Sequence, residues 1–137
     1  MTREEFIVRL CAIFEMDTKD IYSYGQHNGW LEYEDELYRN EPVTRKNIAR
    51  IIHMFLLKEK GIADIPDIHE AEVLRDLYDC RACANHVAQV YLRGIMDAKD
   101  LAVNGGFKWF NLDGEDSDDD IDECVSRARK VVEGLGV

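Results

Sequence analysis

Two cysteines and a histidine, Cys80, Cys83 and His86, stand close enough in the sequence to suggest a zinc or thiol redox site. The apolar residues around them recur at helical spacing, however, and both cysteines fall on the apolar face of that helix. His86 is directed roughly 120° away from the middle of this face, because each helical residue is rotated by about 100°. Cys11 and Cys124 also occupy apolar positions. We therefore expect four buried free thiols, with a zinc or redox site and a disulfide as the alternatives.

An acidic segment, residues 111–123, holds eight of the 28 acidic residues and invites a calcium-binding interpretation. An EF-hand loop requires glycine at its sixth position and glutamate at its twelfth. Counted from Asn111, these positions hold Asp116 and Asp122, and a count from Asp113 fits no better. We therefore expect a solvated loop that leads into a charged helix N-terminus, with weak cation binding as the alternative, and we predict no metal site.

Three further histidines, His27, His53 and His69, are isolated in the sequence. Histidine can act as an acid or a base near neutral pH, but neither a nucleophile nor a glycine-rich phosphate loop accompanies these residues. We therefore predict no catalytic residues, no cofactor and a non-enzymatic function. The net charge of −11 also disfavours nucleic acid as a partner, because phosphate contacts require clustered lysine and arginine.

Three predicted helices that would position these residues share one sequence pattern at their starts. Thr2, Thr44 and Ser117 are each followed by apolar residues at the fourth, eighth and eleventh positions, which is the spacing of one helix face. A threonine or serine hydroxyl is also suited to accept a hydrogen bond from the first turn of a helix, and Glu5 completes a capping box with Thr2. The pattern predicts three helices, at roughly residues 2–16, 44–59 and 117–134.

A fourth apolar stripe, from Val73 to Tyr91, predicts either one helix or two helices that are broken near Asp79. The segments between the predicted helices are long. We therefore predict an all-α single domain, residues 1–137, with about four main helices and long connecting loops. The expected parts are two degenerate repeat units, about residues 1–43 and 44–116, and a closing helix at 117–134.

The sequence contains no apolar run that approaches the roughly 20 residues of a membrane-spanning helix. Glu4 and Glu5 near the start do not fit a signal peptide. We expect no membrane association. We expect a cytoplasmic protein if Met1 is the native start, and a cell-surface protein if the chain is an excised fragment.

A turn sequence and a helix head occur in a recurring order along the chain. GWL at residues 29–31 precedes PVTR at residues 42–45, and a second unit has DIPDI at 64–68 and YLRGIM at 91–96. This order resembles the S-layer homology (SLH) repeat. The resemblance implies a helical packing of repeats and noncovalent attachment to acidic cell-wall polysaccharide.

The resemblance also implies which residues would bind the glycan. A guanidinium group suits a carboxylate and an indole face suits a sugar ring. The implied ligand-binding residues are the two helix heads and the turn: Thr2, Arg3, Gly29, Trp30, Thr44 and Arg45.

An alternative function rests on departures from the SLH pattern. The third helix head has Asp118 in place of the arginine, and residues 22–38 form an aromatic loop. These features favour an intracellular protein-interaction or oligomerisation scaffold that kept the fold and lost glycan binding. The expected partner is therefore cell-wall polysaccharide or another protein, which includes a second copy of the chain as a homo-oligomer.

Overall fold

A computed structural model of the chain describes residues 1–101 and 107–134. This described part is mostly helical and contains one small antiparallel hairpin, which confirms the predicted all-α class in outline. The α-helices are α1 (Arg3–Ile13), α2 (Ile21–Asn28), α3 (Tyr33–Leu37), α4 (Arg45–Met54), α5 (Ala84–Leu92) and α6 (Asp118–Gly134). Shorter turns of π- or 3₁₀-helix are η1 (Phe55–Glu59), η2 (His69–Val73) and η3 (Leu77–Asp79), and the hairpin pairs β1 (Lys99–Leu101) with β2 (Phe107–Trp109).

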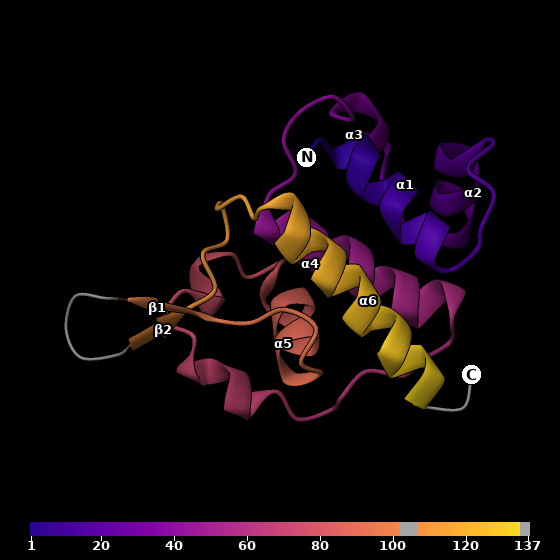
Figure 1. Ribbon diagram of the computed structural model, residues 1–137. Coiled ribbons are helices and arrows are strands. Elements are labelled where there is room, and N and C mark those ends of the chain that lie inside the picture. The colour runs from indigo at the N-terminus through magenta and orange to yellow at the C-terminus, as the bar shows by residue number, and fades with distance from the viewer. Residues whose placement is uncertain (102–106, 135–137) are drawn as a thin grey trace.

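The helices pack around one cluster of buried apolar side chains. Helix α4 packs against α5, and α1 packs against α6. In Figure 1, α6 crosses in front of α4, α5 lies below α4, and the hairpin projects to the left. Trp30 and Phe55 meet edge to face in the core, with their ring centroids 5.0 Å apart. None of the described helices combines the length and the apolar character that crossing a membrane requires.

The three helices predicted from Ser and Thr positions are present as α1, α4 and α6. Thr2 and Glu5 form the predicted capping box, since each side chain bonds the backbone N–H of the other at 3.0–3.1 Å. Ser117 Oγ accepts a hydrogen bond from the backbone N–H of Asp120 at 3.2 Å. Thr44 instead accepts from the side chain of Asn47, so its hydroxyl makes no cap to the backbone. Helix α4 continues as the π-helical turn η1 before Gly61, which has a φ of 69°.

The stripe from Val73 to Tyr91 contains less α-helix than a single break near Asp79 would leave. Only Ala84–Leu92 forms α-helix, and the preceding residues form η2 and η3. Asp76 lies between these turns and accepts hydrogen bonds from the backbone N–H groups of Phe110 and Asn111, at 2.7 and 2.9 Å. These bonds hold the segment around Asp76 against the chain that follows β2. Because the segment is held there, the stripe does not form one continuous helix.

The expectation of four buried free thiols is correct for two cysteines and wrong for the other two. Cys11 and Cys124 are buried and free, and burial raises the pKa of each thiol to about 11. Cys80 and Cys83 form a disulfide. Both lie in the turn between η3 and α5, so helical phase does not describe where their side chains point.

Two features of the long connections were not predicted. Residues 17–43 contain α2 and α3, and residues 95–116 contain the hairpin. Helix α3 begins with a capping box between Glu32 and Asp35 rather than with a serine or threonine. The division into two SLH-like repeat units remains a prediction.

Candidate functional site

The arginine at the head of α1 belongs to a buried ion cluster. Arg3 Nη1 lies 3.1 Å from Asp35 Oδ1, and Arg50 of α4 makes two hydrogen bonds to the same carboxylate at 2.5 and 3.0 Å. Asp35 is 0% exposed. Burial alone would lower the pKa of Arg50, but the hydrogen bonds and charge of Asp35 outweigh it and raise that pKa. The cluster therefore ties α3 to α1 and α4 through one carboxylate that two guanidinium groups share, while Arg3 Nε is buried without a hydrogen-bond partner among the described residues.

The arginine at the head of α4 is bound internally as well. Arg45 is 3% exposed, and its Nη1 donates to Asp116 Oδ2 at 2.5 Å. Its other nitrogens donate to the backbone oxygens of Phe110 and Asp97 at 2.7 and 2.6 Å. The guanidinium also stacks 4.5 Å from the centre of the Phe110 ring. Arg45 thus fastens the segments on both sides of the hairpin to the start of α4.

The other residues that the SLH resemblance implied also have structural contacts. Gly29 ends α2 in the left-handed conformation, with a φ of 86°, where a side chain would be strained. Trp30 is 1% exposed, so its indole face is covered by the core. Thr2 and Thr44 make the local hydrogen bonds described above. Arg3 and Arg45 pair with different carboxylates, and both are buried.

A polar cavity of about 210 Å³ lies beside Arg45. Arg127 forms part of its wall and bonds Asp97 at 2.9 Å and Glu123 at 3.2 Å. Lys99 lies 3.4 Å from Asp116 in the same wall. The cavity is therefore lined by cations that already have carboxylate partners: Arg45, Lys99 and Arg127 with Asp97, Asp116, Asp120 and Glu123.

A second hollow has a different character. A groove of about 330 Å³ lies between α1 and α2 and is bordered by one residue of α3. Its apolar wall is formed by Ile7, Val8, Ile21 and Tyr22. Its carboxylates are Glu4, Asp20 and Glu36, and none of the described residues that line it is basic. We call this hollow the acidic groove.

Two contacts organise the side chains of the acidic groove. The hydroxyl of Tyr22 donates to Glu4 Oε1 at 3.0 Å, and burial together with this bond raises the pKa of Tyr22. Gln26 of α2 contacts Glu36 of α3 at 3.4 Å. The wall and rim of the groove are therefore held together by polar contacts between the three helices.

Helix α3 adds exposed apolar side chains close to the acidic groove. Tyr33 is 67% exposed and Leu37 is 53% exposed, and residues four positions apart share one helix face. Tyr38, the next residue, is also exposed. Glu36 in the same short helix lines the groove. Apolar surface and negative charge therefore alternate along α3.

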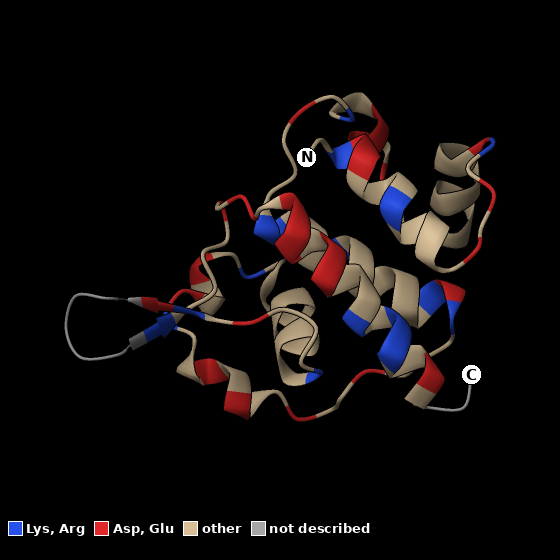
Figure 2. Cartoon of the chain, in the orientation of Figure 1, with Lys and Arg blue, Asp and Glu red and all other residues tan. Residues whose placement is uncertain are grey.

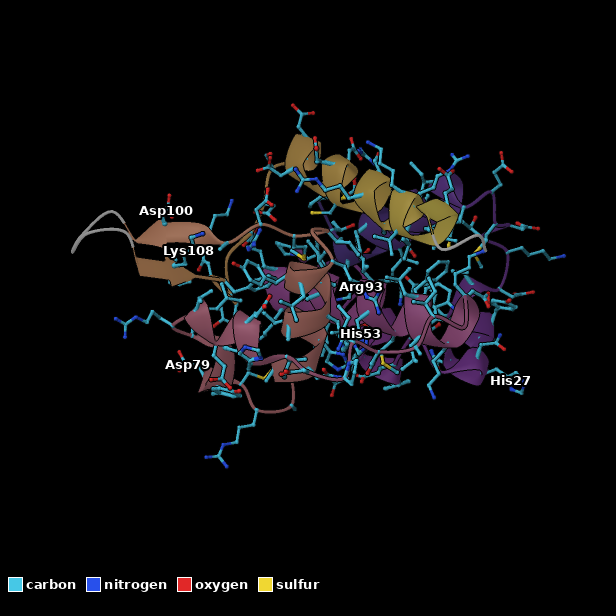
Figure 3. All side chains as sticks on the ribbon, turned by 90° about the horizontal axis from the view of Figure 1, so that it is seen from below. His27, His53, Asp79, Arg93, Asp100 and Lys108 are labelled. Atoms are coloured by element: carbon cyan, nitrogen blue, oxygen red, sulfur yellow. A yellow bond between two sulfur atoms is a disulfide. The ribbon has the colours of Figure 1, made fainter. Side chains whose placement is uncertain are left out.

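A chain of hydrogen bonds links Asp64, His53 and His86. His53 Nε2 lies 2.7 Å from Asp64 Oδ1, and His53 Nδ1 lies 2.7 Å from His86 Nδ1. Because the carboxylate can only accept, neutral His53 donates from Nε2 and accepts at Nδ1, so His86 donates from Nδ1. Burial lowers the pKa of His86 to about 4, and the positive charges of Arg50 and of His53 in its protonated form act in the same direction. Figure 3 shows His53 among the side chains next to α5.

Sequence reasoning missed the partners in each of these clusters. Asp35, Asp64 and Asp116 come from segments that were predicted as connections, and only the fold brings them to Arg3, His53 and Arg45. In the described part of the chain, no group of three or more His, Cys, Asp or Glu side chains is arranged so that it could hold a metal ion. Comparison of the chain with protein-family models, curated proteins and solved structures finds no match.

Proposed function

We propose that this chain is a non-catalytic protein-interaction module that binds a basic, partly apolar segment of another protein in the acidic groove. The observation that carries the proposal is the lining of the groove, which combines four apolar side chains with three carboxylates. A lysine or arginine side chain suits such a site, because its alkyl stem packs on apolar surface while its charge meets a carboxylate.

Long-range electrostatics support the same partner. Residues 1–43, which contain α1, α2 and α3, include ten acidic and four basic residues. Figure 2 shows red segments on α1 and α3 around this part of the molecule. A field of one sign speeds the approach of an oppositely charged partner. The exposed Tyr33 and Leu37 provide apolar contact area beside the groove, and tyrosine is enriched at protein interfaces.

The test uses the full chain and a fluorescein-labelled peptide of alternating lysine and leucine, with binding measured by fluorescence anisotropy. We expect saturable binding that Glu36→Lys weakens about tenfold, equivalent to about 1.4 kcal/mol. Glu70→Lys is the matched control, because it makes the same charge change on the exposed surface of η2. The control should change the affinity by less than about twofold.

Equal effects of the two variants would mean that the peptide responds only to the net charge of −11, and the proposal would be wrong. A labelled peptide of alternating glutamate and leucine provides the second comparison and should not bind. Rising salt should weaken binding of the lysine peptide, because the groove is open to solvent and its charges are screened.

Binding of acidic cell-wall polysaccharide is the second candidate function. Its basis is the SLH resemblance together with the cavity beside Arg45, whose lining includes Lys99 and Arg127 as well as the four carboxylates named above. Co-sedimentation with purified wall material, compared for the unmodified chain and Lys99→Glu, tests it. Sedimentation that Lys99→Glu abolishes would support glycan binding, whereas the absence of sedimentation would end it.

A further inference from the structure

The Cys80–Cys83 disulfide lies at the surface, in the turn that leads into α5. Both cysteines are partly exposed, and their Cα atoms are 5.2 Å apart. Cys83 is the N-cap residue of α5, and the backbone N–H of Val87 donates to its carbonyl oxygen at 2.9 Å. A hollow lined by Tyr78, Arg81 and Ala84 lies alongside. A thiol of another molecule can therefore approach the sulfur atoms without unfolding of the core.

Helix α5 is held in place by contacts that do not involve the disulfide. The side chain of Gln89 bonds both the N–H and the carbonyl oxygen of Ile65, each at 2.9 Å. Asn85 donates to Asp64, and Arg93 near the end of the helix donates to the carbonyl oxygen of Ala63. Figure 2 shows α5 without charged residues along most of its length, consistent with its packing against α4. Opening the disulfide therefore leaves these anchors in place.

The surroundings of the two sulfur atoms are electrostatically different. Cys83 lies at the N-terminal, positive end of the α5 dipole, and the first turn of α5 carries no acidic residue. That position stabilises a thiolate. Cys80 instead lies between the exposed acid Asp79, labelled in Figure 3, and the exposed base Arg81, whose opposite charges offset one another, so Cys80 lacks the stabilisation that the helix end gives a thiolate at Cys83. Because the more stable thiolate is the better leaving group, attack on Cys80 with release of Cys83 is the favoured direction.

We propose that Cys80 and Cys83 form a thiol–disulfide exchange site that accepts electrons from dithiol proteins. A thiolate of the partner attacks Cys80 Sγ, the bond between the two cysteines breaks, and its electron pair leaves on Cys83 Sγ. The partner's second thiolate then attacks the partner's first sulfur atom, which is bonded to Cys80 in the mixed disulfide, and Cys80 is released as a thiolate. The partner departs as a disulfide, oxidised by two electrons, and the chain gains two electrons and two protons from solvent.

In the first experiment, the folded 137-residue chain is equilibrated in glutathione buffers that differ in the ratio of reduced to oxidised glutathione. Free thiols are then blocked with a maleimide, and the number of blocked thiols is measured by mass spectrometry. We expect the Cys80–Cys83 disulfide to be reduced while the circular dichroism spectrum stays native, so that the maleimide blocks both of these thiols together. Cys11 and Cys124 serve as internal controls, because buried thiols with raised pKa values should remain unmodified in the folded chain. A disulfide that opens only when the chain unfolds would overturn the proposal.

The second experiment tests the direction of attack. After reduction with dithiothreitol and its removal, brief treatment with iodoacetamide near pH 7 should alkylate Cys83 at least tenfold faster than Cys80, as measured by peptide mapping. The Cys83→Ser variant, incubated with oxidised glutathione, should accumulate a stable mixed disulfide between Cys80 and glutathione, because no neighbouring thiol is left to displace the glutathione. Equal alkylation rates, or no mixed disulfide in this variant, would contradict the proposed mechanism.

Discussion

Replacing Asp35 with asparagine tests whether the buried ion cluster holds α3 against α1 and α4. The substitution keeps the size of the side chain and removes its charge, which leaves buried Arg3 without a counter-ion and half-buried Arg50 with only Glu32, at 4.0 Å. Removing one partner of a buried ion pair costs about 3–5 kcal/mol. That loss is a large share of the 5–15 kcal/mol by which domains are usually stable.

Urea unfolding followed by circular dichroism measures this effect. With an m-value of about 2 kcal/mol per molar urea, a loss of about 4 kcal/mol lowers the unfolding midpoint by about 2 M. The matched control is Asp122→Asn, which breaks the pair between Arg9 and Asp122 on the solvent-exposed surface. Pairs of this kind contribute little, so the midpoint of the control should stay close to that of the unmodified chain.

The comparison of these two variants decides between two interpretations of Arg3. If Asp35→Asn lowers the midpoint no more than Asp122→Asn does, Asp35 is not the residue that fastens α3. Arg3 would then be available to a ligand, as the SLH resemblance implied. A shift near 2 M supports a structural role for this arginine.

Two other predictions concern His86 and Gly29. Because burial lowers the pKa of His86 to about 4, the unfolded chain binds more protons between about pH 6.5 and pH 4, so stability is retained above that window and lost as the pH falls through it. Replacement of His86 by glutamine should reduce the fall in urea midpoint between pH 7 and pH 5, whereas the same change at the exposed His69 should not. Gly29→Ala should destabilise the fold by about 1 kcal/mol at its φ of 86°, while Gly134→Ala, in helix α6 with open space around it, should not lower the melting temperature.

The helices that the sequence predicted correctly are those whose signals are local. In α1 the hydroxyl of Thr2, the carboxylate of Glu5 and the apolar spacing all lie within a few turns of one helix. The acidic first turn of α6 is equally local, because negative charge is favoured at the positive end of that helix. Such signals can be read without knowing what the helix packs against.

The candidate site could not be predicted in the same way, because its partners are distant in sequence. Arg45 and Asp116 are 71 residues apart, and Arg3 and Asp35 are 32 apart. The disulfide was misjudged for a different reason. The helical phase that placed Cys80 and Cys83 in the core does not begin until Ala84, and before that point the chain forms turns held by Asp76.

The burial of arginine also determines what the surface can bind. Arg3, Arg45 and Arg50 are all drawn inside by aspartates, so three of the 17 basic residues contribute little to the surface of the protein. The exposed surface of α1 and α3 is left dominated by carboxylates, with Tyr33 and Leu37 among them. An acidic ligand would have to displace Asp35 or Asp116 to reach a buried guanidinium, and it would leave that aspartate buried without its partner. A basic ligand in the acidic groove instead meets carboxylates that form no ion pair with any described residue, and it breaks no buried pair. The same arginines that suggested an acidic ligand from the sequence therefore favour a basic one in the fold.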